Sequence, residues 1–348
     1  MTSSSTKLPT TWHRAAAGSP HDLAGSRGGG GSLQGSAGAA TGAAGVHLDR
    51  TRNGVRVLVD RRALLRYVTL PETAQRDSPK PYLHPLRTTA GQVVTAVRPH
   101  DHPWHNGLQL TSANLSGQNF WGGRTYVRDQ GYVPLPNNGS IRHLRWRELA
   151  TRAGHVVLSH DLRWTTSQGQ DWIAEERTLQ VRDVDFERGA WLLRFSTRLR
   201  NISGAPLRWG SPTTEGRPMA GYGGLFWRGP RSFVSGSVRT SDGVVGDAAM
   251  GHRSAWLAYT GTHDGSLKRS TLVFVDSPGN PRWPTPWFVR STPYPVVSFA
   301  FAFDQPLLLP AGDTLTLDYH VVIADGAWST PAIQDYLAHR VPAAAGAE

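Results

Sequence analysis

Three consecutive stretches decide the fold class of this chain: HVVLSHDLRW at 155–164, DWIAEERTLQV at 171–181 and WLLRFSTRLRN at 191–201. Apolar and polar side chains alternate along much of each stretch, which is the period of a half-buried β-strand. No helical pattern lies between the stretches, so they lack the crossovers that parallel strands need. We therefore predict neighbouring antiparallel strands.

The same pattern continues in both directions along the chain. VHLDRTRNGVRVLVD at 46–60 contains two short runs around Asn53 and Gly54, a strong hairpin signal. Further runs with strand character are LLRYVTL (64–70), QVVTAV (92–97), IRHLRWREL (141–149), PLRWGS (206–211), SAWLAYTG (254–261), TLVFVD (271–276), VVSFAFAF (296–303) and DTLTLDYHVVIAD (313–325). We predict an all-β protein, a large antiparallel β-sandwich, with one short C-terminal helix that Thr330 caps and Pro331 begins.

Composition narrows the class of protein. The 348 residues are 39% hydrophobic, include no cysteine and carry a formal net charge of +11. The lack of cysteine excludes disulfides, thiol catalysis and Cys-ligated metal centres. Because only Lys7, Lys80 and Lys268 are lysines, the charge comes from arginines dispersed along the chain. Dispersed arginine is weak evidence for nucleic acid, so we predict no such partner.

Residues 1–45 are rich in Gly, Ala, Ser and Thr and offer little apolar surface, which predicts a disordered tail. A single sandwich domain at 46–340 and a second disordered tail at 341–348 complete the predicted organisation. No signal-peptide run precedes the domain, and no stretch approaches the roughly 20 apolar residues of a membrane span. We therefore expect a cytoplasmic protein with no membrane partner. The sequence indicates no oligomeric state.

The stretch HDHPWHNG at 100–107 concentrates three histidines within one loop. His102 and His105 could converge on a metal together with a carboxylate such as Asp101. Alternatively, an imidazole beside a carboxylate can donate and accept protons, or the rings can simply pack around Trp104. We rank proton transfer or substrate hydrogen bonding above metal binding. No cofactor is predicted, and a divalent metal at the two histidines stays open.

Two loop segments, 119–132 and 211–230, place aromatic rings beside arginines and glycines. Aromatic faces stack on the CH-rich face of a sugar, while arginine forks hold its hydroxyl or carboxylate groups. Each of these side chains, taken alone, could equally belong to loop core. Glu215 and Arg217 face the same side if the chain is extended there, which makes Glu215 the leading candidate for a catalytic carboxylate. A surface ion pair is its alternative role.

Several blocks, taken together, resemble a known family. They are, in chain order, KPYLHPLRTTAGQVVT, RPHDHPWHNGL, NFWGG, GRPMAGYGGLFWRGP and NPRWPTPWFVR. Over roughly residues 50–326 they resemble the bacterial family labelled "methane oxygenase PmoA". The resemblance implies a β-supersandwich similar to galactose mutarotases, in which a His protonates the ring oxygen and a Glu deprotonates the anomeric hydroxyl. We interpret the label as a misnomer, because the membrane subunit of methane monooxygenase consists of transmembrane helices and none is predicted here.

We therefore expect a carbohydrate-active enzyme of the epimerase, lyase or hydrolase type that uses His/Glu acid–base chemistry on a sugar or sugar derivative. The expected catalytic residues are His102, His105 and Glu215. The expected substrate-binding residues are His84, His100, Trp104, Asn106, Trp121, Arg124, Arg217, Tyr222, Trp227 and Arg290. Two other classes stay open: a metal-dependent oxygenase with two His and one carboxylate on iron, and a non-catalytic carbohydrate-binding protein.

Overall fold

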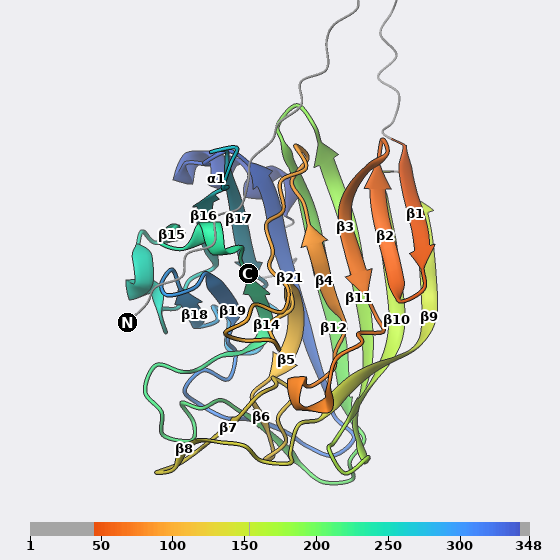
Figure 1. Ribbon diagram of the computed structural model, residues 1–348, viewed down its shortest axis with the longest axis vertical. Helices are drawn as coiled ribbons and strands as arrows, with labels where there is room; N and C mark the ends of the chain where they lie inside the picture. Colours follow the sequence, from red (N-terminus) through yellow and green to blue (C-terminus); the bar gives the residue numbers. More distant parts are fainter. Residues whose placement is uncertain (1–44, 153, 342–348) are drawn as a thin grey trace, which may run out of the picture. The chain divides into compact units, whose positions relative to one another are not determined.

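Two antiparallel sheets of eight strands each lie one behind the other (Figure 1). The computed structural model describes residues 45–152 and 154–341, so the predicted tails fall outside the described residues except at positions 45 and 341. In spatial order, the first sheet contains β1 (Val46–Thr51), β2 (Gly54–Val59), β3 (Arg62–Val68), β4 (Tyr82–Leu86), β5 (Leu108–Ser112), β14 (Gly223–Arg228), β19 (Val296–Phe299) and β18 (Trp287–Arg290).

The three strands predicted at 155–164, 171–181 and 191–201 are neighbours in the second sheet. It contains, in spatial order, β15 (Ser237–Thr240), β16 (Trp256–Thr262), β17 (Arg269–Asp276), β21 (Thr314–Asp325), β12 (Ala190–Asn201), β11 (Asp171–Asp185), β10 (His155–Thr165) and β9 (Ser140–Arg152). Smaller elements complete the fold: β20 (Leu307–Leu309), β13 (Leu207–Gly210), β6 (Asn114–Leu115), β7 (Thr125–Val127), β8 (Gly131–Val133), η1 (Gln75–Asp77), η2 (Arg231–Phe233), η3 (Gly246–Ala249) and α1 (Thr330–Arg340).

Apolar side chains from both sheets meet between the layers. Leu158, Leu179 and Phe195 are register partners across β10, β11 and β12, and each is at most 1% exposed. Burying a side chain of this size contributes about 1.5–3 kcal/mol. Aromatic pairs join the two sheets, such as Phe299 of β19 with Tyr319 of β21, whose ring centroids lie 4.2 Å apart. The predicted all-β antiparallel sandwich is confirmed.

Two local predictions are wrong. Residues 92–97 form only isolated bridges instead of a strand, because their backbone hydrogen bonds go to different segments: the Val94 amide donates to the Leu86 carbonyl and the Ala96 amide to the Arg228 carbonyl. The helix α1 begins at Thr330, and its cap is Ser329, whose side chain accepts a hydrogen bond from the Ala332 amide at 3.4 Å. Of the described helices, none is long and apolar enough to cross a bilayer.

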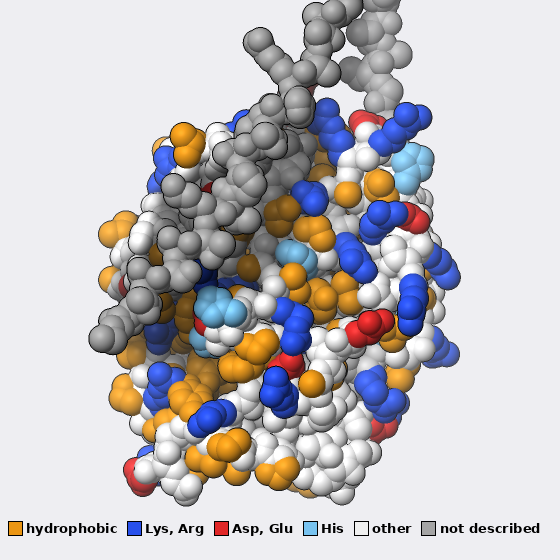
Figure 2. Space-filling view, in the orientation of Figure 1, with side chains coloured by type: hydrophobic (Ala, Val, Ile, Leu, Met, Phe, Trp, Pro, Cys, Tyr) orange, Lys and Arg blue, Asp and Glu red, His pale blue; other side chains and the backbone are white. Residues whose placement is uncertain are grey.

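Charge on the surface is distributed as the composition suggests. On the face drawn in Figure 2, Lys and Arg side chains are separated from one another by hydrophobic and uncharged groups.

The loops that follow β3, β5 and β13 contribute to one end of the sandwich, where β7 and β8 lie below β5 in Figure 1. This end holds the cavity described next.

Candidate functional site

A cavity of about 670 Å³ lies among these loops, and its walls come from segments far apart in the sequence. They are residues 76–77, 102–105, 121–138, 217–226 and 288–296. Both loop segments that the sequence singles out, 119–132 and 211–230, contribute lining residues. A volume of this size matches that of small-molecule sites.

Most of the predicted site residues line this cavity. They are His102, Trp104, His105, Trp121, Arg124, Arg217, Tyr222 and Arg290. Aromatic rings pack side by side in its wall: the centroid of Trp121 lies 4.4 Å from that of Tyr222 and 4.7 Å from that of Phe226. The cavity therefore combines flat apolar walls with guanidinium and imidazole groups.

Asp101 and His102 form a hydrogen-bonded pair at the cavity. Nδ1 of His102 lies 3.0 Å from Oδ2 of Asp101, and the His102 side chain is 27% exposed. Burial lowers the pKa of His102 from its usual 6.5, although the Asp101 hydrogen bond and charge oppose this shift. Burial alone would raise the pKa of Asp101, but its bonds to His102 and Arg228 hold it at about 2. At neutral pH the pair thus contains a carboxylate and a neutral imidazole, whose Nδ1–H donates to Asp101 and whose Nε2 is free to accept a proton.

Arg228 ties this pair to the second histidine. Its guanidinium donates to both carboxylate oxygens of Asp101, at 3.3 and 3.2 Å, and to Nδ1 of His105 at 3.2 Å. The rings of His102 and His105 stack with centroids 4.6 Å apart. His105 is only 2% exposed, and burial lowers its pKa well below the usual value. His102 is therefore the histidine that a ligand reaches.

Two glycines allow the Trp104 ring to lie against the backbone. A Cβ at Gly122 would lie 2.5 Å from Cβ of Trp104, and one at Gly123 would lie 2.6 Å from its Cη2 atom. Both residues also have positive φ angles, of 113° and 68°. Only glycine combines this conformation with so close an approach. The glycine pair in NFWGG therefore fixes the position of one cavity wall.

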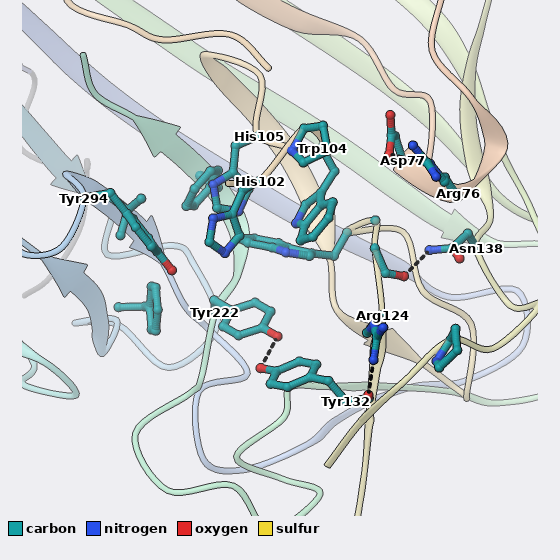
Figure 3. A pocket seen from close by; sticks show the side chains of 18 of the residues that line it. Arg76, Asp77, His102, Trp104, His105, Arg124, Tyr132, Asn138, Tyr222 and Tyr294 are labelled. Carbon is teal, nitrogen blue, oxygen red and sulfur yellow. Dashed lines mark hydrogen bonds and ion pairs between the residues drawn. The ribbon is translucent and has the colours of Figure 1, made fainter. Parts of the chain in front are cut away.

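Tyrosine hydroxyls form the opposite side of the cavity. The hydroxyls of Tyr132 and Tyr222 lie 2.8 Å apart (Figure 3). Arg217 donates a hydrogen bond to the Tyr132 hydroxyl. Tyr294 lies nearer the histidines, with its ring centroid 4.8 Å from that of His102 and 4.3 Å from the Arg228 guanidinium carbon. Burial raises the pKa of both Tyr222 and Tyr294 above the usual value, so both hydroxyls are protonated at neutral pH.

The structure does not place Glu215 with the histidines, contrary to prediction. Its carboxylate accepts a hydrogen bond from Arg208 at 2.8 Å and does not line the cavity, although Arg217, two residues along, does. The predicted stacking role of Trp227 is also contradicted. Its side chain is fully buried between the sheets, and its indole donates to the Val94 carbonyl at 2.8 Å. No ligand could stack on that ring.

The remaining predicted binding residues lie outside the cavity lining. Nδ1 of His84 lies 2.9 Å from Thr95 Oγ1, and burial lowers its pKa to about 4. His100 is exposed and contacts Arg231 at 3.2 Å. Asn106 is 3% exposed and donates to the Trp104 carbonyl at 3.4 Å. None of these three side chains is positioned to contact a ligand in the cavity.

Sequence reasoning missed groups whose partners come from distant segments. Asp77 lines the cavity, and its Oδ2 lies 2.9 Å from Arg98 Nη1. Lys80 is 1% exposed and donates to the carbonyls of Trp121 at 2.9 Å and Asp77 at 3.4 Å, which joins two walls. Burial lowers its pKa to about 7. The only feature of the sequence that could have drawn attention to Lys80 is that the chain has just three lysines.

A metal centre at His102 and His105, the alternative that the sequence left open, does not fit the described side chains. They contain no cluster of three or more His, Cys, Asp or Glu groups that could hold an ion. Nδ1 of His102 contacts Asp101 and Nδ1 of His105 contacts Arg228, while the two rings stack face to face. Stacked rings do not direct their nitrogens toward a common point.

Comparison with known proteins gives a family but no activity. Residues 54–338 match the model described as "Family of unknown function (DUF6807)". No curated protein sequence matches significantly. Among solved structures, the chain is similar to a GH36 alpha-galactosidase, AgaA from Geobacillus stearothermophilus, in complex with raffinose (13% identity, TM-score 0.38, 88% of this chain and 43% of that one). It is also similar to the alpha-galactosidase from Lactobacillus brevis (8%, 0.33, 86% and 42%). The chain spans less than half the length of both, and similarities this distant assign no activity.

Proposed function

Because this chain belongs to DUF6807, a family of unknown function, we propose its function from the cavity alone. The protein binds a sugar or sugar derivative, and His102 transfers a proton on that ligand while Asp101 positions its ring. One observation carries the proposal: the 3.0 Å contact between His102 Nδ1 and Asp101 Oδ2 at the wall of a cavity of about 670 Å³.

The arrangement suits a general base. Since Asp101 accepts the proton on Nδ1, the lone pair on Nε2 of His102 is available to the ligand. An imidazole with a lowered pKa is neutral at physiological pH and needs no prior deprotonation. Tyr294, beside the His102 ring, keeps its hydroxyl proton and can return one to the ligand. Epimerases and lyases begin with abstraction of a proton from the ligand by such a base, and an inverting hydrolase uses one to activate water.

The walls suit a sugar. The rings of Trp121 and Tyr222 offer flat faces for C–H groups, and the arginines around them donate hydrogen bonds to oxygens. In this proposal, Asp101 and His102 replace the His/Glu pair expected from the mutarotase likeness, because Glu215 is paired with Arg208. The proposed chemistry uses no cofactor, so a chelator should leave it unchanged.

Solvent exchange tests the proposal directly. The protein would be incubated in D₂O with a panel of neutral and acidic monosaccharides, and ¹H NMR would follow loss of C–H signals, new anomers and new products. We expect turnover of at least one compound. His102→Gln should reduce its rate by at least about 10²-fold, which is the contribution of a positioned acid–base group. Asp101→Asn should reduce it less, because the imidazole remains.

His100→Gln is the matched control, because that histidine lies two residues from His102 but outside the cavity lining. It should leave the rate unchanged. Binding without turnover, undiminished in His102→Gln, would instead identify a carbohydrate-binding protein. Stoichiometric iron in the purified protein, with turnover abolished by chelator, would favour the metal-dependent oxygenase suggested by the PmoA label.

A further inference from the structure

The cavity wall carries more positive than negative charge. Four guanidinium groups line it, and Asp77 is its only lining carboxylate among the described residues. That carboxylate is already paired, at 2.9 Å, with Arg98. The lining guanidiniums belong to Arg76, Arg124, Arg217 and Arg290. The cavity therefore has a net positive charge before a ligand enters.

Three of these four arginines lack an acidic partner in the part of the chain that the structure describes. Within the described part of the chain, Arg124, Arg217 and Arg290 have no carboxylate within ion-pair distance, and Arg76 lies 3.8 Å from Asp77. Several buried or half-buried arginines outside the cavity do have acidic partners, as in the contacts of Arg177 with Glu175 at 2.7 Å, Arg194 with Asp318 at 2.7 Å and Arg208 with Glu215 at 2.8 Å. The cavity thus brings together three guanidinium groups that have no carboxylate partner among the described residues.

Two of the unpaired guanidiniums lie against aromatic side chains of the cavity wall. Arg217 donates to the Tyr132 hydroxyl, which lies 2.8 Å from that of Tyr222. Nε of Arg290 is buried without a hydrogen-bond partner, and its guanidinium carbon lies 5.7 Å from the Phe288 ring centroid. A buried donor that lacks a partner destabilises the fold, and a hydrogen bond to a ligand oxygen would offset this cost.

We propose that the ligand of this cavity is anionic, a sugar derivative that carries a carboxylate or a phosphate group, held by Arg217 and Arg290. The inference rests on the proposed function for the sugar part and on the unpaired arginines for the charge. Arginine forks bind both kinds of anion with two parallel hydrogen bonds, so the structure assigns the shared chemistry. The source of the charge is decided by experiment.

Matched pairs of ligands provide the test. Isothermal titration calorimetry would compare glucuronate with glucose and galacturonate with galactose. Glucose 6-phosphate would be compared with glucose and with glucuronate, and inorganic phosphate would be titrated separately. At least one acidic compound should bind about tenfold or more tightly than its neutral partner, which is the effect of one charge-assisted hydrogen bond. Added salt should weaken that binding. The preferred acidic compound identifies the anion as carboxylate or phosphate.

Variants locate the charge contacts. Arg290→Gln should weaken binding of the acidic compound about tenfold and leave the neutral partner unaffected. Arg198→Gln, at an exposed position of β12 away from the cavity, is the matched control and should change neither. Because glutamine retains a hydrogen-bond donor and most of the side-chain length, circular dichroism and thermal unfolding of Arg290→Gln should match the unaltered protein.

Each outcome decides between the two proposals. Equal affinity for neutral and acidic sugars would overturn the anionic ligand while leaving the proposed function intact. Binding of inorganic phosphate without any sugar derivative would overturn the proposed function, since only the charge argument would survive. An acidic sugar that binds Arg217→Gln and Arg290→Gln as tightly as the unaltered protein would refute the assignment of these two clamps.

Discussion

Replacing Lys80 with methionine should change how stability depends on pH. The ammonium group is buried behind the cavity, and burial lowers its pKa from 10.5 to about 7, with the Asp77 charge opposing the shift. Between these two values the unfolded chain binds a proton that the folded protein has released. The free energy of unfolding of the unaltered protein therefore rises with pH across this window, and it loses this contribution as pH falls toward 7.

The magnitude follows from the two pKa values. A full proton difference changes the free energy of unfolding by about 1.4 kcal/mol per pH unit, so the rise from about pH 7 to about pH 9 is about 2 kcal/mol. Methionine keeps the length of the apolar stem and removes the amine. The difference in unfolding free energy between the unaltered protein and Lys80→Met should therefore grow by about 2 kcal/mol over this range.

Urea unfolding followed by tryptophan fluorescence at a series of pH values measures this difference. Tyrosines with raised pKa values also titrate at high pH, but they are common to both proteins and cancel in the difference. Lys268→Met is the control, since Lys268 is exposed, and its difference should stay constant. If the difference in unfolding free energy for Lys80→Met is also independent of pH, the conclusion that burial lowers the pKa of Lys80 is refuted.

Three further predictions concern the cavity. Gly123→Ala should displace the Trp104 ring, because the new Cβ would lie 2.6 Å from Cη2, and calorimetry should show ligand affinity at least about tenfold lower. Glu215→Gln should leave turnover unchanged and alter the free energy of unfolding by less than about 1 kcal/mol, as for other partly exposed ion pairs. The rate of turnover should fall only below pH 6.5, where His102 gains a proton, and Asp101→Asn should move that midpoint to still lower pH, because Asp101 raises the pKa of His102.

Each of these has a result that would contradict it. Gly91→Ala serves as control for the first, since Gly91 also has a positive φ, of 85°, but a Cβ at this position would have no atom within 4 Å; equal losses in both variants would point to backbone strain alone. A large loss of turnover in Glu215→Gln would restore the role expected from sequence. A midpoint above pH 6.5 would show that His102 is not the group that titrates.

The sandwich could be predicted because its strands are long and regular. In β10, β11 and β12, alternation continues far enough that burial of one face leaves a clear period in the sequence. Short segments carry less information. Residues 92–97 contain the same residue types as a strand, but their backbone bonds go to several different segments, which depends on the finished fold.

The site was predictable where partners are adjacent in sequence and not where they are distant. Asp101 and His102 are neighbours, so their pairing could be anticipated from the chain. The partner of Glu215 is Arg208, in β13, and the neighbouring Arg217 gave no indication of it. Trp227 lies on a strand whose last five residues are all buried, and a pattern without a polar face cannot show which side chains reach a cavity.

The wall of the cavity is assembled from residues between 76 and 296, so it exists only when the first and second halves of the chain have come together. A ligand held there stabilises the native state as a whole, by an amount that grows with the logarithm of its concentration. Amide protons in the middle of β11 and β12, which contribute no residue to the cavity lining, should consequently exchange with solvent more slowly when ligand is bound.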